Sequence, residues 1–362
     1  MNQRRRVVTM LGVVVVGAFA VTFAIGNRGS AGSLLRGVGS IDLSVAIVGV
    51  VCSALAIGNR GLLNRAAHRA VGLDAGVGAM THTAAVGFAA QKMIKSAGAV
   101  GLAVFVRHGK RRGHAPCAVA AACLLTASAS FVAMGVLLAA ALLALAVTGQ
   151  LTGWWLAAGV AFAAYALVLA PLAVLVLRNP RAAHWAWRGG QRIRRRLPWC
   201  KNRDASDAQF PTALLDAVAD ARTRPGAMRD VLLHAVVSKV LGALALVAAI
   251  TAVGLPITAA SALVIYATAL AASLLTIVPG GIGTVEASTT ALLIGAGATA
   301  GAAALAVALF RLFDLWLPVL TGAAVARRDA RRDRRSAHAE SQLSYTVDLA
   351  RLEHWAGAST HL

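Results

Sequence analysis

The sequence predicts an all-α protein: a polytopic membrane helix bundle with six full spans and two interrupted hairpins that face in opposite directions. Its 362 residues are 58% hydrophobic and 14% charged, whereas soluble domains are about 45–50% apolar and about 25% charged. Aromatic residues make up only 5%, so the excess consists of small and aliphatic residues, which suit packed membrane helices. This composition argues against the soluble enzymes and excludes intrinsic disorder and collagen-like fibres.

Six apolar runs have the length that a helix needs to cross a bilayer, which is about 20 residues. They cover residues 7–25, 41–58, 118–147, 153–177, 230–253 and 302–325. The first run follows Arg4-Arg5-Arg6, as in a signal peptide, but its small-residue triplet Ala18-Phe19-Ala20 falls in mid-span. We therefore expect an uncleaved membrane anchor.

Basic residues alternate with these spans and predict the orientation of the chain. The formal net charge is +21, and 28 Lys and Arg residues fall into five segments: the N-terminus, 59–70, 107–114, 178–229 and the start of the C-terminal tail. The loops that alternate with these basic segments contain only two arginines, both in the first loop. Because basic loops stay in the cytoplasm, we expect a protein of the cytoplasmic membrane with both termini inside. We attribute the basic charge to topology rather than to nucleic-acid binding.

Two further apolar stretches, 81–106 and 258–296, are interrupted. The loops on both sides of 81–106 are basic, so this stretch must enter and leave the membrane from the inside. The loops on both sides of 258–296 lack basic residues, so this stretch must begin and end on the outer side of the membrane. We therefore expect two hairpins of opposite orientation, each either re-entrant or built of two short spans.

The second hairpin is interrupted by Val278-Pro279-Gly280-Gly281-Ile282-Gly283, a run of residues that ends helices. Thr284 can cap the helix that follows, with Glu286 in its first turn. The first hairpin has a weaker break, and when the two stretches are aligned, Gly98 and Gly101 match Gly280 and Gly283. The predicted break residues are Gly98, Gly101, Pro279, Gly280, Gly281 and Gly283.

Paired breaks of opposite orientation are typical of transporters, in which discontinuous helices meet near mid-membrane around the substrate. We therefore expect a solute or a lipid headgroup to be handled where the two breaks meet. The alternative is that the glycines only permit tight helix packing.

Six ionisable residues lie in or near apolar spans and are the candidate lipid-binding and translocation residues: Lys92, Lys95, Lys239, Glu286, Arg311 and Asp314. Each costs roughly 2.5–3.5 kcal/mol at mid-membrane on insertion scales. Four are cations and two are anions, so two cations lack a protein partner, and an anionic ligand such as a phospholipid phosphate would supply one. The alternatives are structural. Lys95 and Glu286 would complement helix dipoles, Arg311 would neutralise a carboxylate, and the other lysines would reach the inner interface.

The residues around the second break resemble a known family. Ile277 to Val285, followed by Glu286-Ala287, resembles the signature PGG-[IL]-G-x-x-E-[AG] of the lysylphosphatidylglycerol synthase transmembrane region family, a flippase-like group. Ala308-Leu309-Phe310-Arg311-Leu312, then Leu315-Trp316-Leu317-Pro318, resembles the last span of that family, and the span around Ser238-Lys239 also fits. The resemblance covers residues 1–328. Related proteins often have Pro-Gly-Gly in the first hairpin, where this chain has Lys95-Ser96-Ala97-Gly98.

The resemblance implies a stand-alone flippase-like region, because the full-length synthases of the family add a large cytoplasmic aminoacyl-transfer domain. Neither the basic loop 178–229 nor the tail is long enough for an enzyme core. We expect a transmembrane domain over 1–328 and a disordered cytoplasmic tail over 329–362. The sequence has no nucleotide-binding, protease or hydrolase motif and no metal-ligand cluster, so we expect neither an enzyme nor a bound cofactor or metal.

We accordingly expect a membrane protein that binds, and translocates, an anionic or modified (glyco)phospholipid. Two alternatives remain: a carrier for a small solute or ion, and a non-transporting partner of a lipid-modifying or glycosyl-transfer enzyme. Loop 178–229 also contains a short amphipathic segment, with Leu214, Leu215 and Val218 opposite Asp216 and Asp220. This segment could contact anionic lipid, or the arginines of the loop could serve topology alone.

Overall fold

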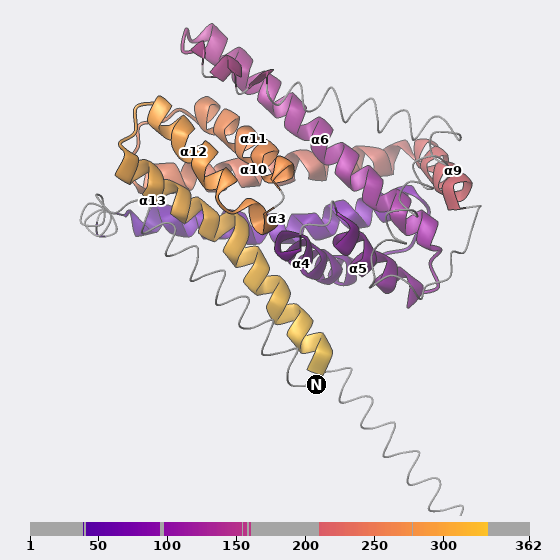
Figure 1. Cartoon of the computed structure of the whole chain (residues 1–362). Coiled ribbons are helices and arrows are strands. Elements are labelled where there is room, and N and C mark those ends of the chain that lie inside the picture. Colours follow the sequence, from indigo (N-terminus) through magenta and orange to yellow (C-terminus); the bar gives the residue numbers. More distant parts are fainter. Residues whose placement is uncertain are drawn as a thin grey trace, which may run out of the picture.

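Every element of the described chain in the computed structural model is a helix (Figure 1). The described residues are 39, 41–94, 98–153, 155–157, 159–160, 210–276 and 278–331. Several predictions therefore fall outside them, namely the first span, most of 153–177, residues 178–209 of the basic loop, Lys95 and the tail from residue 332. Within the described residues, the predicted all-α fold class is confirmed.

The elements follow one another with short connections. In chain order they are α3 (Leu43–Ala70), α4 (Val77–Met93), α5 (Ala99–Lys110), α6 (Pro116–Val147), α9 (Phe210–Arg222), α10 (Pro225–Ala252), α11 (Ala259–Leu275), the 3₁₀ turn η2 (Pro279–Gly281), α12 (Thr284–Gly295), α13 (Ala300–Arg311) and the π-helical turn η3 (Leu312–Trp316). The last helix continues through η3 to Arg331.

Four helices among the described residues are long and apolar enough to cross a membrane: α3, α6, α10 and Ala300–Arg331. They coincide with four of the predicted spans. Their outward faces carry large apolar side chains, such as Leu43 on α3 (71% exposed) and Val147 on α6 (79% exposed). Exposed apolar faces of this kind are stable against lipid and costly against water.

Helix α3 is longer than the sequence predicted. The expected span ended at residue 58, but the helix continues without interruption to Ala70. The assignment of Arg60 to a basic loop after the span was therefore wrong, because Arg60 lies inside this helix, where it is half-buried. Its neighbour Asn59 is buried, at 8% exposure.

The helices repeat in length and order. Helices α3 and α10 have 28 residues each, α4 and α11 have 17, α5 and α12 have 12, and α6 and Ala300–Arg331 have 32. The start of α10 follows that of α3, and the start of α11 follows that of α4, by the same distance along the chain. This repeat distance also separates Gly98 from Gly280, the two glycines that the sequence alignment of the breaks had matched.

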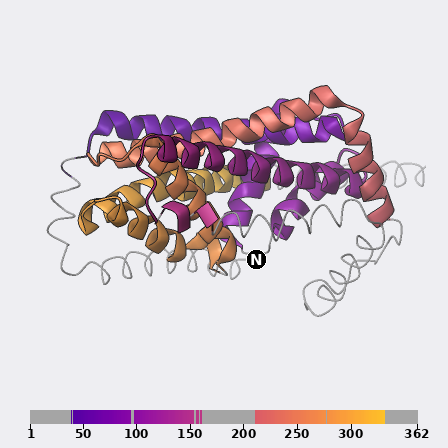
Figure 2. The ribbon, with the colours of Figure 1, turned by 90° about the horizontal axis from the view of Figure 1, so that it is seen from above.

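The two repeats are inverted. The Asp42 amide donates to the Ala252 carbonyl at 2.9 Å, which joins the start of α3 to the end of α10. The Arg224 guanidinium donates to the Ala70 carbonyl at 3.0 Å, which joins the other two ends. The repeat distance relates Asp42 to Arg224 and Ala70 to Ala252. The contact of Asp42 with Ala252 therefore corresponds to the contact of Arg224 with Ala70. Helices α3 and α10 therefore run antiparallel, side by side, as Figure 2 shows.

The antiparallel arrangement orients the hairpins. Since α4 follows α3 and α11 follows α10, the hairpins enter the bundle from opposite ends, in agreement with the prediction. Figure 1 shows α4 and α5 toward one end of the bundle and α11 and α12 toward the other.

Both hairpins contain a helix that is too short to span a bilayer. At about 1.5 Å per residue, the 12 residues of α5 or α12 cover about 18 Å, whereas the hydrocarbon core is about 30 Å thick. Of the two forms that the sequence left open, this length favours re-entrant hairpins.

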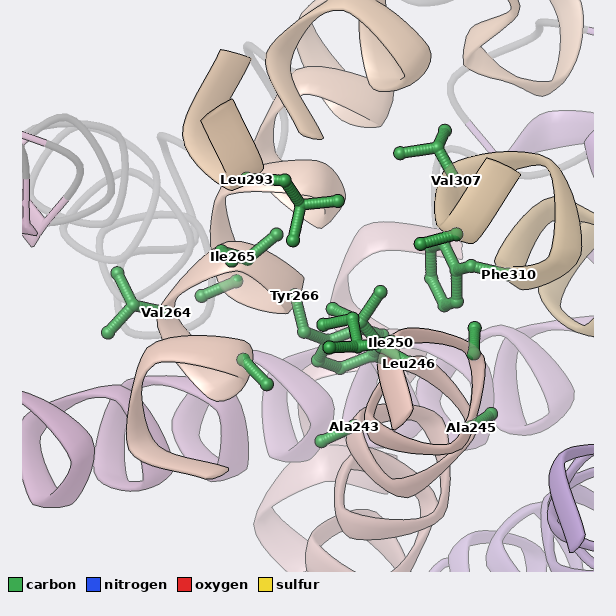
Figure 3. Close-up of a cluster of buried hydrophobic side chains, with 14 of the residues drawn as sticks. Ala243, Ala245, Leu246, Ile250, Val264, Ile265, Tyr266, Leu293, Val307 and Phe310 are labelled. Carbon is green, nitrogen blue, oxygen red and sulfur yellow. The ribbon is translucent and has the colours of Figure 1, made fainter. Parts of the chain in front are cut away.

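The largest core surrounds the second hairpin (Figure 3). Leu246 and Ile250 of α10 pack with Tyr266 of α11 and Phe310 of α13, and each of the four is almost fully buried. The Tyr266 and Phe310 rings meet edge to face with their centroids 6.3 Å apart, which is a favourable aromatic geometry. This core fixes α11, α12 and α13 relative to α10, and so it fixes the position of the break between α11 and α12.

Local signals explain where the helices begin. The Asp42 carboxylate caps α3 by accepting hydrogen bonds from the Ser44 amide at 2.9 Å and from the Ser44 hydroxyl. These bonds favour the charged form and hold the pKa of Asp42 below its usual value. Thr258 and Thr299 cap α11 and α13 with their side-chain oxygens.

The amphipathic segment of the basic loop forms α9, but its apolar face lies against the bundle. Val218 is 6% exposed and Leu214 packs with it, in a cluster with residues of α3, α6 and α10. Asp216 and Asp220 are exposed. Leu214 and Val218 thus face the bundle, while lipid contact by the rest of this loop stays a prediction because residues 178–209 lie outside the described part of the chain.

Candidate functional site

The first break lies between the end of α4 at Met93 and the start of α5 at Ala99. Gly98 has a φ of +87° and precedes α5 directly, a conformation that glycine adopts without steric cost. Gly101, in contrast, lies inside the first turn of α5 and packs against the Gln91 side chain. It is a packing residue of that helix rather than part of the break, so its assignment to the break was wrong.

The second break contains three glycines with positive φ: Gly280 (+67°), Gly281 (+68°) and Gly283 (+88°). It is longer than the first break, because α11 ends at Leu275 and α12 begins only at Thr284. Gly283 precedes α12 directly, as Gly98 precedes α5. Gly98 is therefore the structural counterpart of Gly283 rather than of Gly280, because the second break is longer. Neither sequence match, Gly98 with Gly280 nor Gly101 with Gly283, holds at the starts of the half-helices.

An ion pair holds the second break together. The Arg311 Nε donates to Glu286 Oε1 at 2.7 Å, and an Arg311 Nη donates to the Gly280 carbonyl at 2.7 Å. The other carboxylate oxygen, Glu286 Oε2, accepts from the Gly283 amide at 2.7 Å. Arg311 is 1% exposed. The pair thus satisfies backbone groups of a non-helical segment, which is a requirement for irregular backbone at membrane depth.

A second ion pair links the first hairpin to the last long helix. Lys92, in the last turn of α4, donates to Asp314 Oδ2 of η3 at 2.8 Å. The same turn of α4 touches the second break, because a Cβ atom on Gly280 would lie 3.6 Å from the Lys92 carbonyl. The end of the first half-helix and the middle of the second break therefore meet. We call this region, comprising Arg60, Lys92, Lys239, Tyr266 and Asp314, the junction.

The π-helical turn places Asp314 at the junction. A π turn shifts the usual helical hydrogen-bond pattern and leaves backbone groups to be satisfied otherwise. The Phe313 carbonyl accepts from the Ser53 hydroxyl of α3 at 2.7 Å. Ser53 is buried at 5% exposure, so this hydrogen bond connects the π-helical turn directly to α3.

Arg60 joins the junction from α3. Its guanidinium carbon lies 3.6 Å from the centre of the Phe88 ring, and Lys92 Nζ lies 5.2 Å from the same ring. A cation over an aromatic face is stabilised by about 0.5–2 kcal/mol. Arg60 was not among the candidate site residues predicted from the sequence. Leu62 and Leu63 follow it without a helix-breaking proline, which would have predicted that the helix continues beyond Arg60.

Lys239 joins the junction from α10. The Asn59 amide of α3 donates to the Ser238 hydroxyl at 3.0 Å and to the His234 carbonyl at 2.8 Å, so the helices touch beside Arg60 and Lys239. Lys239 lies close enough to Arg60, Lys92 and Asp314 to interact with each electrostatically. No described carboxylate forms an ion pair with Lys239 or Arg60.

The junction therefore carries three cations and one carboxylate, an excess of positive charge, while the pair of Arg311 and Glu286 is neutral by itself. Lys239 interacts unfavourably with both Arg60 and Lys92, because like charges repel in the low dielectric of a protein interior. A protein that retains such repulsion inside an apolar bundle gains from an anion that relieves it. Of the predicted site residues, the structure places Lys92, Lys239 and Asp314 at the junction and Glu286 and Arg311 at the adjoining second break.

Comparison with known proteins agrees with this architecture. The sequence model described as "Lysylphosphatidylglycerol synthase TM region" matches residues 6–322. The chain belongs to the lysylphosphatidylglycerol synthase TM region family. A search of curated proteins finds no match.

Membership of the lysylphosphatidylglycerol synthase TM region family fixes the general character of the protein. It is a multi-pass integral membrane protein of a family related to the handling of lipid. The family match includes both hairpins, both ion pairs and all five residues of the junction, and it ends within the last long helix. The junction therefore belongs to the common membrane region of the family.

Proposed function

We propose that the protein binds an anionic phospholipid, or a modified form of one, at the junction and moves it between the leaflets of the cytoplasmic membrane. In this proposal the protein acts without catalysis, and both termini lie in the cytoplasm. The observation that carries the proposal is the meeting of the two oppositely directed hairpins at Lys92 and Gly280, beside the ion pair of Lys92 with Asp314 of the last long helix.

Three features support a translocation route rather than simple packing. Half-helices that end inside a bundle leave polar backbone at membrane depth, where it costs free energy unless it is buried or lines a cavity. The chain has an inverted repeat, which is the architecture on which transporters base alternating access. The junction also keeps more positive than negative charge, which favours anionic headgroups.

The proposal is tested by translocation of labelled lipid in proteoliposomes. The purified full-length protein is reconstituted with fluorescent phosphatidylglycerol, and dithionite quenching reports how much label moves between leaflets. We expect Lys92→Met to reduce the rate at least tenfold, because the substitution removes a junction cation and leaves Asp314 without its partner. The matched control is Lys110→Met, which removes an exposed cation from the end of α5 and leaves the rate unchanged.

The headgroup arms of this experiment separate the proposal from its alternatives. Faster movement of phosphatidylglycerol than of phosphatidylcholine supports selection of an anionic lipid. Equal movement of every lipid in protein-containing and protein-free vesicles contradicts the proposal. Electrogenic uptake of a water-soluble solute, with no movement of lipid, favours a small-solute carrier instead.

A further inference from the structure

Arg60 and Lys239 have no charge partner among the described residues, although they pack between helices of the bundle. Arg60 has five N–H donors and Lys239 has three, and none of these donors forms a hydrogen bond with a described residue. Both side chains are half-buried, so a ligand can still reach them. Lys92 and Arg311 are engaged by Asp314 and Glu286. The hydrogen-bond donors of the junction that have no described acceptor therefore lie on one side of it, between α3 and α10.

The Tyr266 hydroxyl is a third donor on that side. Tyr266 is 6% exposed, and its hydroxyl forms no hydrogen bond within the described part of the chain. It lies against the bare backbone of Gly242, where any Cβ atom would overlap it. Gly242 is one turn beyond Lys239 on α10, and the Tyr266 oxygen interacts electrostatically with both Arg60 and Asp314. The hydroxyl oxygen is not among the buried, unpartnered side-chain atoms of the described residues, so it keeps accessible surface that a ligand can reach. Its position beside Arg60 therefore offers a further hydrogen-bond donor to an anion.

The neighbouring contacts hold these donors in place. The Phe88 ring packs against the Arg60 guanidinium, and Asn59 fixes the register of α3 and α10 through Ser238. The Asn59 side-chain oxygen lies 2.7 Å from His234 Nδ1, so both ends of the Asn59 amide are engaged and do not compete for a ligand. Guanidinium, ammonium and hydroxyl groups together form the donor set that suits a tetrahedral oxyanion.

We propose that Arg60, Lys239 and the Tyr266 hydroxyl form a binding site for a phosphate-bearing anion. The inference deepens the proposed function, and it rests on that function for the identification of the anion with the phosphodiester of a lipid headgroup. In this arrangement Arg60 and Tyr266 bind phosphate oxygens, and Lys239 neutralises the charge. The pair of Lys92 and Asp314 borders the site on the side of the second break.

The test is calorimetric titration of the purified full-length protein with three soluble probes. Dihexanoyl phosphatidylglycerol carries the phosphodiester, inorganic phosphate carries the anion alone, and dihexanoylglycerol carries the chains without phosphate. We expect the first probe to bind and the third not to bind, and equal binding of the first and third would overturn the proposal. Binding of inorganic phosphate as well indicates that the anion alone suffices, whereas its failure to bind assigns the site to lipid.

The variants assign the binding to the named residues. Lys239→Met is expected to weaken binding of the phosphodiester at least tenfold, because it removes a charge-assisted hydrogen bond and one of the two free charges. Lys239→Arg should restore most of the affinity, and Tyr266→Phe should weaken binding about three- to tenfold. The exposed cation variant Lys110→Met serves as the matched control and should bind like the unchanged protein. Thermal unfolding of each variant checks that it is folded.

The outcomes separate this inference from the proposed function. If Lys239→Met and Tyr266→Phe bind the phosphodiester as tightly as the unchanged protein does, the site assignment is wrong even where lipid translocation is observed. If binding depends on Lys239 and Tyr266 but no lipid moves in proteoliposomes, the site stands and the translocation proposal fails.

Discussion

Arg311 donates a 2.7 Å hydrogen bond to the carbonyl oxygen of Gly280, so a side chain of the last long helix holds the middle of the second break. The same arginine pairs with Glu286, whose carboxylate in turn accepts from the Gly283 amide. One buried ion pair therefore determines the path of the chain between α11 and α12. If Arg311 only neutralised a carboxylate, the hydrogen bonds of this pair to the Gly280 carbonyl and the Gly283 amide would have no role.

Removing one member of this pair should destabilise the protein strongly. In Glu286→Gln, Arg311 remains almost fully buried without its counter-charge, and breaking a buried pair in this way costs about 3–5 kcal/mol. We expect a marked fall in the melting temperature of the detergent-purified protein, measured by intrinsic tryptophan fluorescence. The double variant Glu286→Gln with Arg311→Met should be less destabilised than the sum of the two single variants. Strict additivity would mean that the two side chains are not coupled.

The break glycines should differ in their tolerance of alanine. Gly281→Ala combines a positive φ with close approach, since its Cβ would lie 2.8 Å from the Val285 side chain and 3.1 Å from Ser273 Cα. Gly98→Ala has only the positive φ, because its Cβ would meet nothing nearer than 4.0 Å. We expect Gly98→Ala to cost about 1–2 kcal/mol and Gly281→Ala to cost more.

The control for the glycine series is Gly135→Ala in α6. Gly135 has ordinary helical geometry and open space at its Cβ position, so alanine should be neutral or stabilising by up to about 1 kcal/mol. The melting temperatures should fall in the order Gly135→Ala, Gly98→Ala, Gly281→Ala. A Gly281→Ala variant as stable as Gly135→Ala would contradict the geometry of the second break.

Ser53 should matter through the π-helical turn. Ser53→Ala leaves the Phe313 carbonyl without its side-chain donor, which costs about 1–3 kcal/mol for a buried group. Ser130 of α6 is the matched control, because its hydroxyl donates at 2.7 Å to the Thr126 carbonyl, one turn earlier in the same helix. We expect Ser130→Ala to change the melting temperature little. Equal effects of the two substitutions would indicate that Ser53 contributes only helix packing.

Lys92 and Asp314 should be coupled more weakly than Arg311 and Glu286. Their side chains are 15% and 23% exposed, against 1% and 13% for Arg311 and Glu286, so the pair is less desolvated and its coupling should be smaller. A double-mutant cycle on unfolding, with Lys92→Met and Asp314→Asn, measures this coupling. In the translocation assay, by contrast, Lys92→Met should have a large effect. A coupling above that of Arg311 and Glu286 would show that the pair is mainly structural.

Much of this architecture could be predicted from the sequence because the bilayer constrains helices strongly. Apolar length predicted the spans that form α3, α6 and α10, and the parity of basic loops predicted the opposite orientation of the hairpins. The break at Pro279 to Gly283 was predictable because proline and positive-φ glycines leave a local signature. The repeat was visible in the sequence as a few aligned small residues, and the structure shows it in the lengths and order of the helices.

The pairing of charges could not be derived from the sequence. Nothing local distinguishes Glu286 from Asp314 as the partner of Arg311, because the choice depends on the π-helical turn that directs Asp314 toward α4. The place of Arg60 was misjudged for a similar reason. A basic residue at the end of an apolar run is ordinarily interfacial, and only the packing of Phe88 against Arg60 reveals that Arg60 is internal. Tyr266 carried no signal at all, since a lone tyrosine in an apolar helix is typical of a core.

The contact between the end of α4 and the second break is tested most directly by thiol cross-linking in native membranes. Cysteines at positions 92 and 280 are introduced into a chain whose own four cysteines are replaced, and a short bifunctional reagent is applied. We predict efficient cross-linking of this pair and none between positions 110 and 280, because Lys110 is exposed at the far end of α5. If both cysteines of the first pair react singly with maleimide but never cross-link, the two hairpins do not meet, and no shared lipid site exists between them.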